Sequence, residues 1–156
     1  MMEFLGSDVN VSKFKDRIAG YGGFINITQN THKVVFCGTF TAKGLREEIR
    51  DGKLVITHEG AVQKFIDKVG QITFSAEYAH KHNQQVMFIT ERCVFVLTDK
   101  GLVLTEIAPG VDLQKDILDQ MEFVPHIAEN LKTMDERLFR DEPMGLAQDI
   151  FEQQAG

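Results

Sequence analysis

The sequence predicts an α/β protein, and three observations support this prediction. Residues 33–41 form a nearly continuous apolar run, which is typical of a strand covered on both faces, as in a parallel sheet. Residues 86–98 are rich in β-branched and aromatic side chains, and an Asp-Lys-Gly turn separates them from a returning strand at 102–107. Helical patterns occupy 76–83 and the stretch from Asp112 to Met121.

The last of these helices has a defined start and stop. Asp112 is expected as its N-cap, because its side chain can accept from the first free backbone amides. Pro125 ends the helix, because proline cannot continue the hydrogen-bond ladder. Its apolar face consists of Leu113, Ile117, Leu118 and Met121, and we interpret it as a packing face.

Other segments are less uniform. Residues 24–27 fit either a strand or the first turn of a helix. Asp51-Gly52 between two extended segments predicts an exposed edge hairpin. Residues 61–75 combine helical spacing with a strand-like end at Gln71–Phe74, and the acidic tail 130–156 is expected to be helical in pieces and to form a surface or subunit contact.

Composition limits the possible functions. The 156 residues fit one domain or a large piece of one, and twelve of the fourteen aromatic residues are Phe, which favours core packing. A net charge of −6 argues against nucleic acid as a partner, and no apolar stretch approaches the ~20 residues of a membrane helix. Cys37 and Cys93 lie in apolar runs and are expected to be buried, reduced thiols, so a cytoplasmic location is the default.

A glycine-rich loop is the main functional signal. Gly20, Gly22 and Gly23 lie within four positions and precede an apolar run that contains Asn26. Glycine permits backbone conformations that a Cβ forbids, and it lets amides approach a ligand closely. Such a loop can present amides to an acyl oxygen or a phosphate.

An ordered set of motifs resembles the C-terminal part of the class I coenzyme A transferases, most closely the acetate/propionate type and also the succinyl-CoA:3-oxoacid type. The resemblance covers nearly the whole chain. The matching segments are 10–14 (NVSKF), 20–27 (GYGGFINI), 33–41 (KVVFCGTFT), 71–75 (QITFS), 89–95 (ITERCVF), 101–110 (GLVLTEIAPG) and 134–139 (MDERLF).

The resemblance implies a CoA-transferase-like α/β fold with a mostly parallel sheet, an antiparallel addition near Leu102–Ile107, and flanking helices. Residues 1–156 would form an incomplete catalytic domain, with 130–156 as the helical tail. The implied activity moves CoA between short-chain carboxylic acids through a glutamyl-CoA intermediate, with acyl-CoA and a carboxylic acid as substrates, no tightly bound cofactor, and a homo-oligomeric assembly. Each step passes through an oxyanion that preorganised amides must stabilise.

The chain departs from the family at the nucleophile. The family's glutamate lies in a Glu-Asn-Gly segment, which occurs nowhere here, and Glu129-Asn130 is followed by Leu131. We therefore interpret the chain as a fragment, a truncated reading frame or one piece of a split enzyme. It would need an amino-terminal half or partner subunit, and alone it should be inactive.

Carried over by the resemblance, Gly22 and Gly23 would offer backbone amides to the oxyanion or acyl carbonyl; the alternative is a tight turn. Asn26 would contact the loop or the substrate, and a capping role is an equal alternative. Lys43 follows the apolar run of 33–41 and would meet a CoA phosphate, unless it is a solvated turn lysine.

The remaining chemistry-bearing residues favour structural roles. Glu91 and Glu106 lie in apolar strands, where a carboxylate is costly unless paired, and Arg92 is expected to point to the opposite face from Glu91. His80 and His82 are expected to be solvated on a helix, so no metal site is predicted. Two other readings remain: a non-catalytic module that self-associates or binds acyl-CoA, and, with less support, a sugar-phosphate isomerase.

Overall fold

The computed structural model describes residues 2–5, 8–11, 13–14, 17–18, 20, 22–67 and 72–154. Tyr21 of the glycine loop, Gln71 and the last two residues of the tail lie outside them. The strands are β1 (Glu3–Leu5), β2 (Asp8–Asn10), β3 (Lys13–Phe14), β4 (Arg17–Ile18), β5 (Lys33–Cys37), β6 (Thr41–Ala42), β7 (Arg46–Arg50), β8 (Lys53–His58), β9 (Val62–Gln63), β10 (Phe65–Ile66), β11 (Gln85–Ile89), β12 (Cys93–Thr98), β13 (Gly101–Ile107) and β14 (His126–Thr133). The helices are α1 (Phe24–Gln29), α2 (Ala76–Lys81), the π-helix η1 (Leu113–Ile117), the 3-10 helices η2 (Leu118–Gln120) and η3 (Glu136–Phe139), and α3 (Leu146–Gln154).

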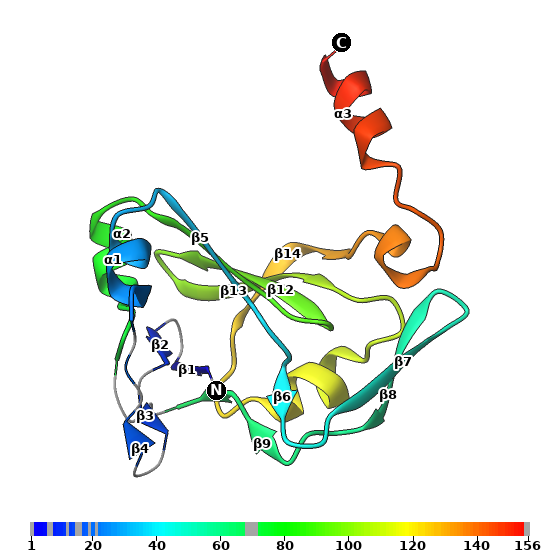
Figure 1. The fold of residues 1–156 in the computed structure, drawn as a ribbon. Helices are drawn as coiled ribbons and strands as arrows, with labels where there is room; N and C mark the ends of the chain where they lie inside the picture. The colour runs from blue at the N-terminus through cyan, green and yellow to red at the C-terminus, as the bar shows by residue number, and fades with distance from the viewer. Residues whose placement is uncertain are drawn as a thin grey trace.

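The central sheet is mixed, and its strand order is β14-β13-β12-β11-β5 (Figure 1). The outer pairs, β5–β11 and β13–β14, are parallel, whereas β12 runs antiparallel to both of its neighbours. This confirms the α/β class and the antiparallel addition at 102–107. The helices α1 and α2 lie together beside one end of the sheet (Figure 1).

Strand β5 corrects two expectations. Its residues alternate in burial: Val34 and Phe36 are buried, whereas Val35 and Cys37 are exposed. The strand ends the order of the sheet, and within the described residues only one of its faces is covered, so the continuous apolar run does not mean burial on both sides. The predicted burial of Cys37 is therefore wrong, while Cys93 on β12 is fully buried as expected.

Three other segments can be compared with the predictions. The strand expected over 86–98 is divided into β11 and β12 by a turn at Thr90–Arg92. The tail from 130, expected to be helical in pieces, begins inside β14, which pairs with β13, and its helical pieces are η3 and α3. In 61–75 the strands β9 and β10 replace the helical alternative.

The core is built mainly from phenylalanine. Phe65 is fully buried, and its ring centroid lies 4.7 Å from that of Phe4, 4.7 Å from that of Phe40 and 5.2 Å from that of Phe95. These distances fall in the range where aromatic pairs contribute about 0.5–1.5 kcal/mol beyond burial. The composition-based expectation of a Phe-packed core is confirmed.

The hairpin of β7 and β8 is held by a second, smaller cluster. Its turn uses Asp51 and Gly52 at φ 51° and 73°, the left-handed pair that an Asp-Gly hairpin requires. Strand β7 is exposed along its length, as predicted for an edge hairpin. The cluster that packs this hairpin and the segment after β14 against the sheet consists of Leu54, Val94, Ala108, Met134 and Phe139.

Candidate functional site

The glycine loop leads directly into α1. Gly22 has φ 50°, and Gly23 is the N-cap of the helix at φ −80°. Both are exposed, and among the described residues neither amide nitrogen donates a hydrogen bond, while the Gly23 carbonyl accepts from Ile27. A Cβ on Gly23 would lie 3.5 Å from Ile27 Cδ1, which is ordinary contact. The positive φ at position 22 therefore favours glycine, whereas position 23 would accommodate a Cβ.

The other two predicted residues lie apart from each other. Asn26 is exposed within α1, and its carbonyl accepts from Asn30 Nδ2 at 2.7 Å, so it is a helix residue and not an N-cap. Lys43 is exposed after β6, at φ 61°, and its carbonyl accepts from Ala61 N at 3.0 Å. Figure 1 shows β6 at the far end of β5 from α2, so the described chain does not join these residues in one cavity.

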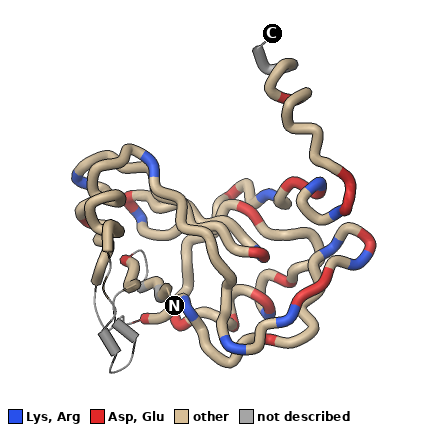
Figure 2. The backbone as a smooth tube through the Cα atoms, in the orientation of Figure 1, with Lys and Arg blue, Asp and Glu red and all other residues tan. Residues whose placement is uncertain are grey.

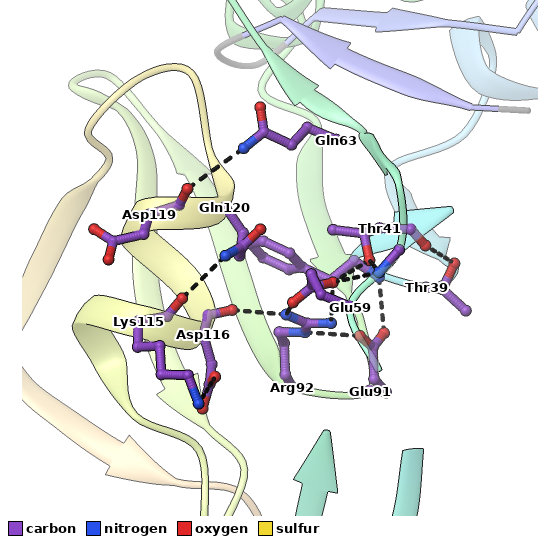
Figure 3. Close-up of polar contacts among 12 residues, drawn as sticks. Thr39, Thr41, Glu59, Gln63, Glu91, Arg92, Lys115, Asp116, Asp119 and Gln120 are labelled. Atoms are coloured by element: carbon purple, nitrogen blue, oxygen red, sulfur yellow. Dashed lines mark hydrogen bonds and ion pairs between the residues drawn. The ribbon is translucent and has the colours of Figure 1, made fainter. Parts of the chain in front are cut away.

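The sequence reasoning missed a buried ion-pair network centred on Arg92. This side chain is fully buried; its Nε donates to Glu91 Oε1 at 2.8 Å, and its Nη1 donates to Glu59 Oε2 at 2.9 Å (Figure 3). Glu91 and Arg92 were expected to diverge on a strand. They converge because residues 90–92 form the turn between β11 and β12.

Further contacts complete the environment of the guanidinium. Nη1 also donates to the Asp116 carbonyl at 2.8 Å, Nη2 donates to Glu59 Oε1 at 3.3 Å, and the group lies 4.8 Å from the centre of the Phe40 ring. Burial by itself would lower the pKa of Arg92, but the two carboxylates outweigh it and the pKa is raised. Arg92 is therefore a permanent cation, and Glu91 is paired, in agreement with its expected structural role.

Glu59 lies in the loop between β8 and β9, and its carboxylate accepts hydrogen bonds from other residues besides Arg92. Thr41 Oγ1 donates to Glu59 Oε1, and Gly60 N donates to the same oxygen at 2.9 Å. Burial alone would raise the pKa of Glu59, but the hydrogen bonds from Arg92, Thr41 and the Gly60 amide together hold it below the ordinary value of 4.5. The unfolded chain therefore binds more protons than the folded one in the range between the two pKa values.

The stabilisation from Glu59 should therefore be present above pH 4.5 and lost as the pH falls through its folded-state pKa. Replacing Glu59 by Gln should flatten the loss of thermal stability between about pH 6 and about pH 3 in a calorimetric series. Glu47 has the opposite effect on the pH dependence of stability, because burial and the nearby Glu91 raise its pKa. Glu47→Gln should make the acid loss slightly steeper, and equal slopes in all three proteins would contradict this assignment.

Lys64 is a second buried cation close to the network. The residue is 5% exposed, and its Nζ donates to Thr39 Oγ1 at 3.3 Å. Burial lowers the pKa of Lys64, and the field of Glu91 opposes this effect. The Glu91 carboxylate thus interacts with two cations, Arg92 and Lys64, from different parts of the chain.

A pocket of about 710 Å³ lies on the hairpin side of the network. Its apolar lining includes Ile89 from β11, Leu54 from β8 and Phe139 from η3, and Glu91 also lines it. Charged residues of both signs lie along the hairpin (Figure 2), but the charged residues that line the pocket are all acidic: Glu47, Glu48, Glu91 and Asp141. None of Gly22, Gly23, Asn26 and Lys43 lines this pocket.

The remaining candidate residues form no metal site in the part of the chain that the structure describes. In the described ranges, no group of three or more His, Cys, Asp or Glu side chains is arranged to hold a metal ion. His80 and His82 are exposed, the latter with its ring against Tyr78 at 3.9 Å. No helix among the described residues is long and apolar enough to cross a membrane.

Comparison with known proteins agrees with the resemblance found in the sequence. The acetate CoA-transferase YdiF of Escherichia coli (strain K12) is 56% identical over 138 residues, which cover 88% of this chain and 26% of that protein. The caffeate CoA-transferase of Acetobacterium woodii is 53% identical over 144 residues, covering 89% of this chain and 27% of that protein. No family model matches the chain.

A solved structure gives the same result for the fold. The crystal structure of the acyl-CoA transferase YdiF from E. coli O157:H7, as a thioester complex with CoA, superposes with a TM-score of 0.89 at 54% identity. The match covers 92% of this chain and 28% of that chain. The chain therefore spans about a quarter of the length of the relatives it matches.

In sequence and fold the chain is therefore similar to one part of the CoA-transferases, which confirms the resemblance to the class I family. Within that class, the resemblance to the acetate type is confirmed by the 56% identity to an acetate CoA-transferase.

Proposed function

We propose that this chain forms part of the active site of a CoA-transferase that moves CoA between short-chain carboxylic acids. The observation that supports this most strongly is the match to a CoA-transferase whose solved structure is a thioester complex with CoA. At 54% identity over 92% of the chain, the likeness extends to sequence as well as fold. Acyl-CoA and a free carboxylic acid would be the substrates.

The reaction would run through a carboxylate that this chain does not contain. A glutamate from a Glu-Asn-Gly segment attacks the thioester carbonyl and releases CoA as a thiolate, leaving a mixed anhydride. The thiolate then attacks the glutamyl carbonyl and releases the first acid, which gives the glutamyl-CoA thioester. The acceptor acid reverses these two steps, so that each bond broken is matched by one formed.

This chain would contribute main-chain donors and a cation. Gly22 and Gly23 are exposed, and their backbone amides would stabilise the oxyanion, because donors fixed before the reaction need no reorganisation. Lys43 would bind a phosphate of CoA, with Asn26 near the substrate. The glycine loop and Lys43 lie apart in the described chain, which agrees with a long ligand such as CoA and with walls supplied by an amino-terminal half or partner subunit.

Reconstitution tests the proposal. The chain is mixed with an amino-terminal CoA-transferase segment that carries Glu-Asn-Gly, and transfer of CoA from acetyl-CoA to propionate is followed. We expect no transfer from either piece alone and transfer from the mixture. Gly23→Val keeps the backbone amide but places a branched side chain where the acyl group would approach it. It should reduce the rate of the mixture by roughly 10²–10³-fold, as much as the loss of one oxyanion donor. A wild-type rate would make Gly23 only a turn residue.

One observation favours an alternative in which the chain is a non-catalytic, self-associating module. Helix α3 extends away from the rest of the fold (Figure 1), and Leu146, Ile150 and Phe151 on it are 52%, 55% and 71% exposed. If mixing with the amino-terminal segment gives neither a complex nor turnover, and the chain alone sediments as a stable oligomer, this reading replaces the first.

A further inference from the structure

The short segment before Lys43 is fixed by contacts to three charged side chains. Lys64 Nζ donates to Thr39 Oγ1 at 3.3 Å, and the Phe40 amide donates to Glu91 Oε2 at 2.8 Å. Thr41 Oγ1 donates to Glu59 Oε1. Three consecutive residues are thus each held by a different charged side chain.

Two of these three anchors depend on the same cation. Arg92 binds both Glu59 and Glu91, so the carboxylates that hold Phe40 and Thr41 are themselves fixed by one guanidinium (Figure 3). The additional bond to the Asp116 carbonyl attaches η1 to the same group. One fully buried cation therefore joins the β11–β12 turn, the β8–β9 loop, η1 and the segment before Lys43.

The β8–β9 loop also restrains Lys43 through backbone hydrogen bonds. Gly60 N donates to Thr41 Oγ1 at 3.2 Å, and Ala61 N donates to the Lys43 carbonyl at 3.0 Å. The loop lies so close that a Cβ on Gly60 would be 2.6 Å from the Ala42 carbonyl oxygen. Lys43 has φ 61°, a conformation that costs a non-glycine residue energy and persists only where the surroundings impose it.

Stability alone does not account for such a network. Buried ion pairs are often no more stabilising than apolar residues of similar volume, because desolvation offsets the attraction between the charges. What the charges add here is geometry: a planar guanidinium that binds two carboxylates fixes the direction of each.

We propose that Arg92, with Glu59 and Glu91, is a positioning device that holds the Thr39–Thr41 segment and thereby presents the Lys43 ammonium to a phosphate of CoA. This inference rests on the proposed function, since it takes CoA as the ligand of Lys43. Arg92 itself touches no substrate and acts only through the segment.

A double-mutant cycle on ligand affinity tests this coupling. Calorimetry would measure the dissociation constants of CoA and of pantetheine, which lacks the phosphates, for the wild type, Glu59→Gln, Lys43→Ala and the double variant. Glu59→Gln should weaken CoA binding by about tenfold, in the range of one charge-assisted hydrogen bond, and leave pantetheine unchanged. In the Lys43→Ala background the effect of Glu59→Gln should disappear. Additive losses, or equal losses for CoA and pantetheine, would overturn the proposal.

Glu77→Gln is the matched control, because it removes an exposed carboxylate that pairs with Lys81 on α2, outside the network. It should change neither affinity. The same proteins are examined by amide hydrogen exchange, which needs no ligand. In Glu59→Gln, exchange at Gly60 and Ala61 should be at least about tenfold faster, with buried β12 amides unchanged.

These readouts separate the two hypotheses. If the wild-type chain binds no CoA while exchange at Gly60 and Ala61 rises as expected, the proposed function fails and the positioning of the segment stands. If exchange is unchanged in Glu59→Gln, the positioning role is wrong whatever the affinity for CoA.

Discussion

Replacing Arg92 by methionine is expected to lower the free energy of unfolding by about 3–5 kcal/mol, one of the two largest effects in this chain. The guanidinium is fully buried and makes four hydrogen bonds to Glu59, Glu91 and the Asp116 carbonyl. Methionine fills much of the same space but leaves two carboxylates facing each other without a cation. Urea unfolding followed by circular dichroism would measure the difference.

Arg50→Met is the matched control, because Arg50 also pairs with a glutamate, Glu48, but the side chains are 63% and 42% exposed. Such surface pairs contribute about 0–1 kcal/mol, so this variant should remain close to the wild type. The acid partners at Arg92 are 30% (Glu59) and 13% (Glu91) exposed, which places the expected loss towards the lower end of the range. Equal losses for both arginines would show that the buried network contributes no more than a surface pair.

Replacing Gly110 by alanine should be similarly damaging, with a loss of about 2–5 kcal/mol from left-handed backbone strain and overpacking together. Gly110 has φ 89°, and a Cβ there would lie 2.7 Å from the Leu54 carbonyl oxygen and 2.9 Å from Lys53 Cβ. The clash falls at the point where Leu54 N donates to the Pro109 carbonyl and ties the hairpin to the sheet. Thermal unfolding would measure the loss.

Gly101→Ala separates the two causes. Gly101 has φ 94°, nearly the same backbone strain, but a Cβ there meets no described atom within 4 Å. Its loss should be limited to about 1–2 kcal/mol, the cost of the left-handed conformation. If the two alanine variants are equally unstable, steric contact with Leu54 plays no part and the hairpin is not held as described.

Local patterns predicted those elements whose structure depends on neighbouring residues in the chain. The Asp51-Gly52 hairpin, the Asp112 cap, which accepts from Lys115 N at 2.7 Å, and the return at Gly101–Ile107 are confirmed. Each depends on turn chemistry, capping or alternation, which act over a few residues. The expected helix after Asp112 is a π-helix followed by a 3-10 turn, and within it the Asp116 carbonyl accepts from Arg92 Nη1.

The patterns failed where distant segments meet. Apolar patterning did not predict the interruption of the run 86–98 at Thr90–Arg92, because Cys93 continues the same composition after the turn. A signal was present: Glu91 and Arg92 are charges inside an apolar run, and burying them requires partners. Those partners, Glu59 and the Asp116 carbonyl, lie 33 and 24 positions away in the sequence.

The sequence by itself determined the resemblance to the class I CoA-transferases, the order of most elements and the residues proposed to contact CoA, because motifs and turn signals are written in consecutive residues. Only the tertiary structure decided which of those residues are held rigidly and by what. A buried guanidinium is stable only where carboxylates from separate loops converge on it. That convergence is a property of the folded chain.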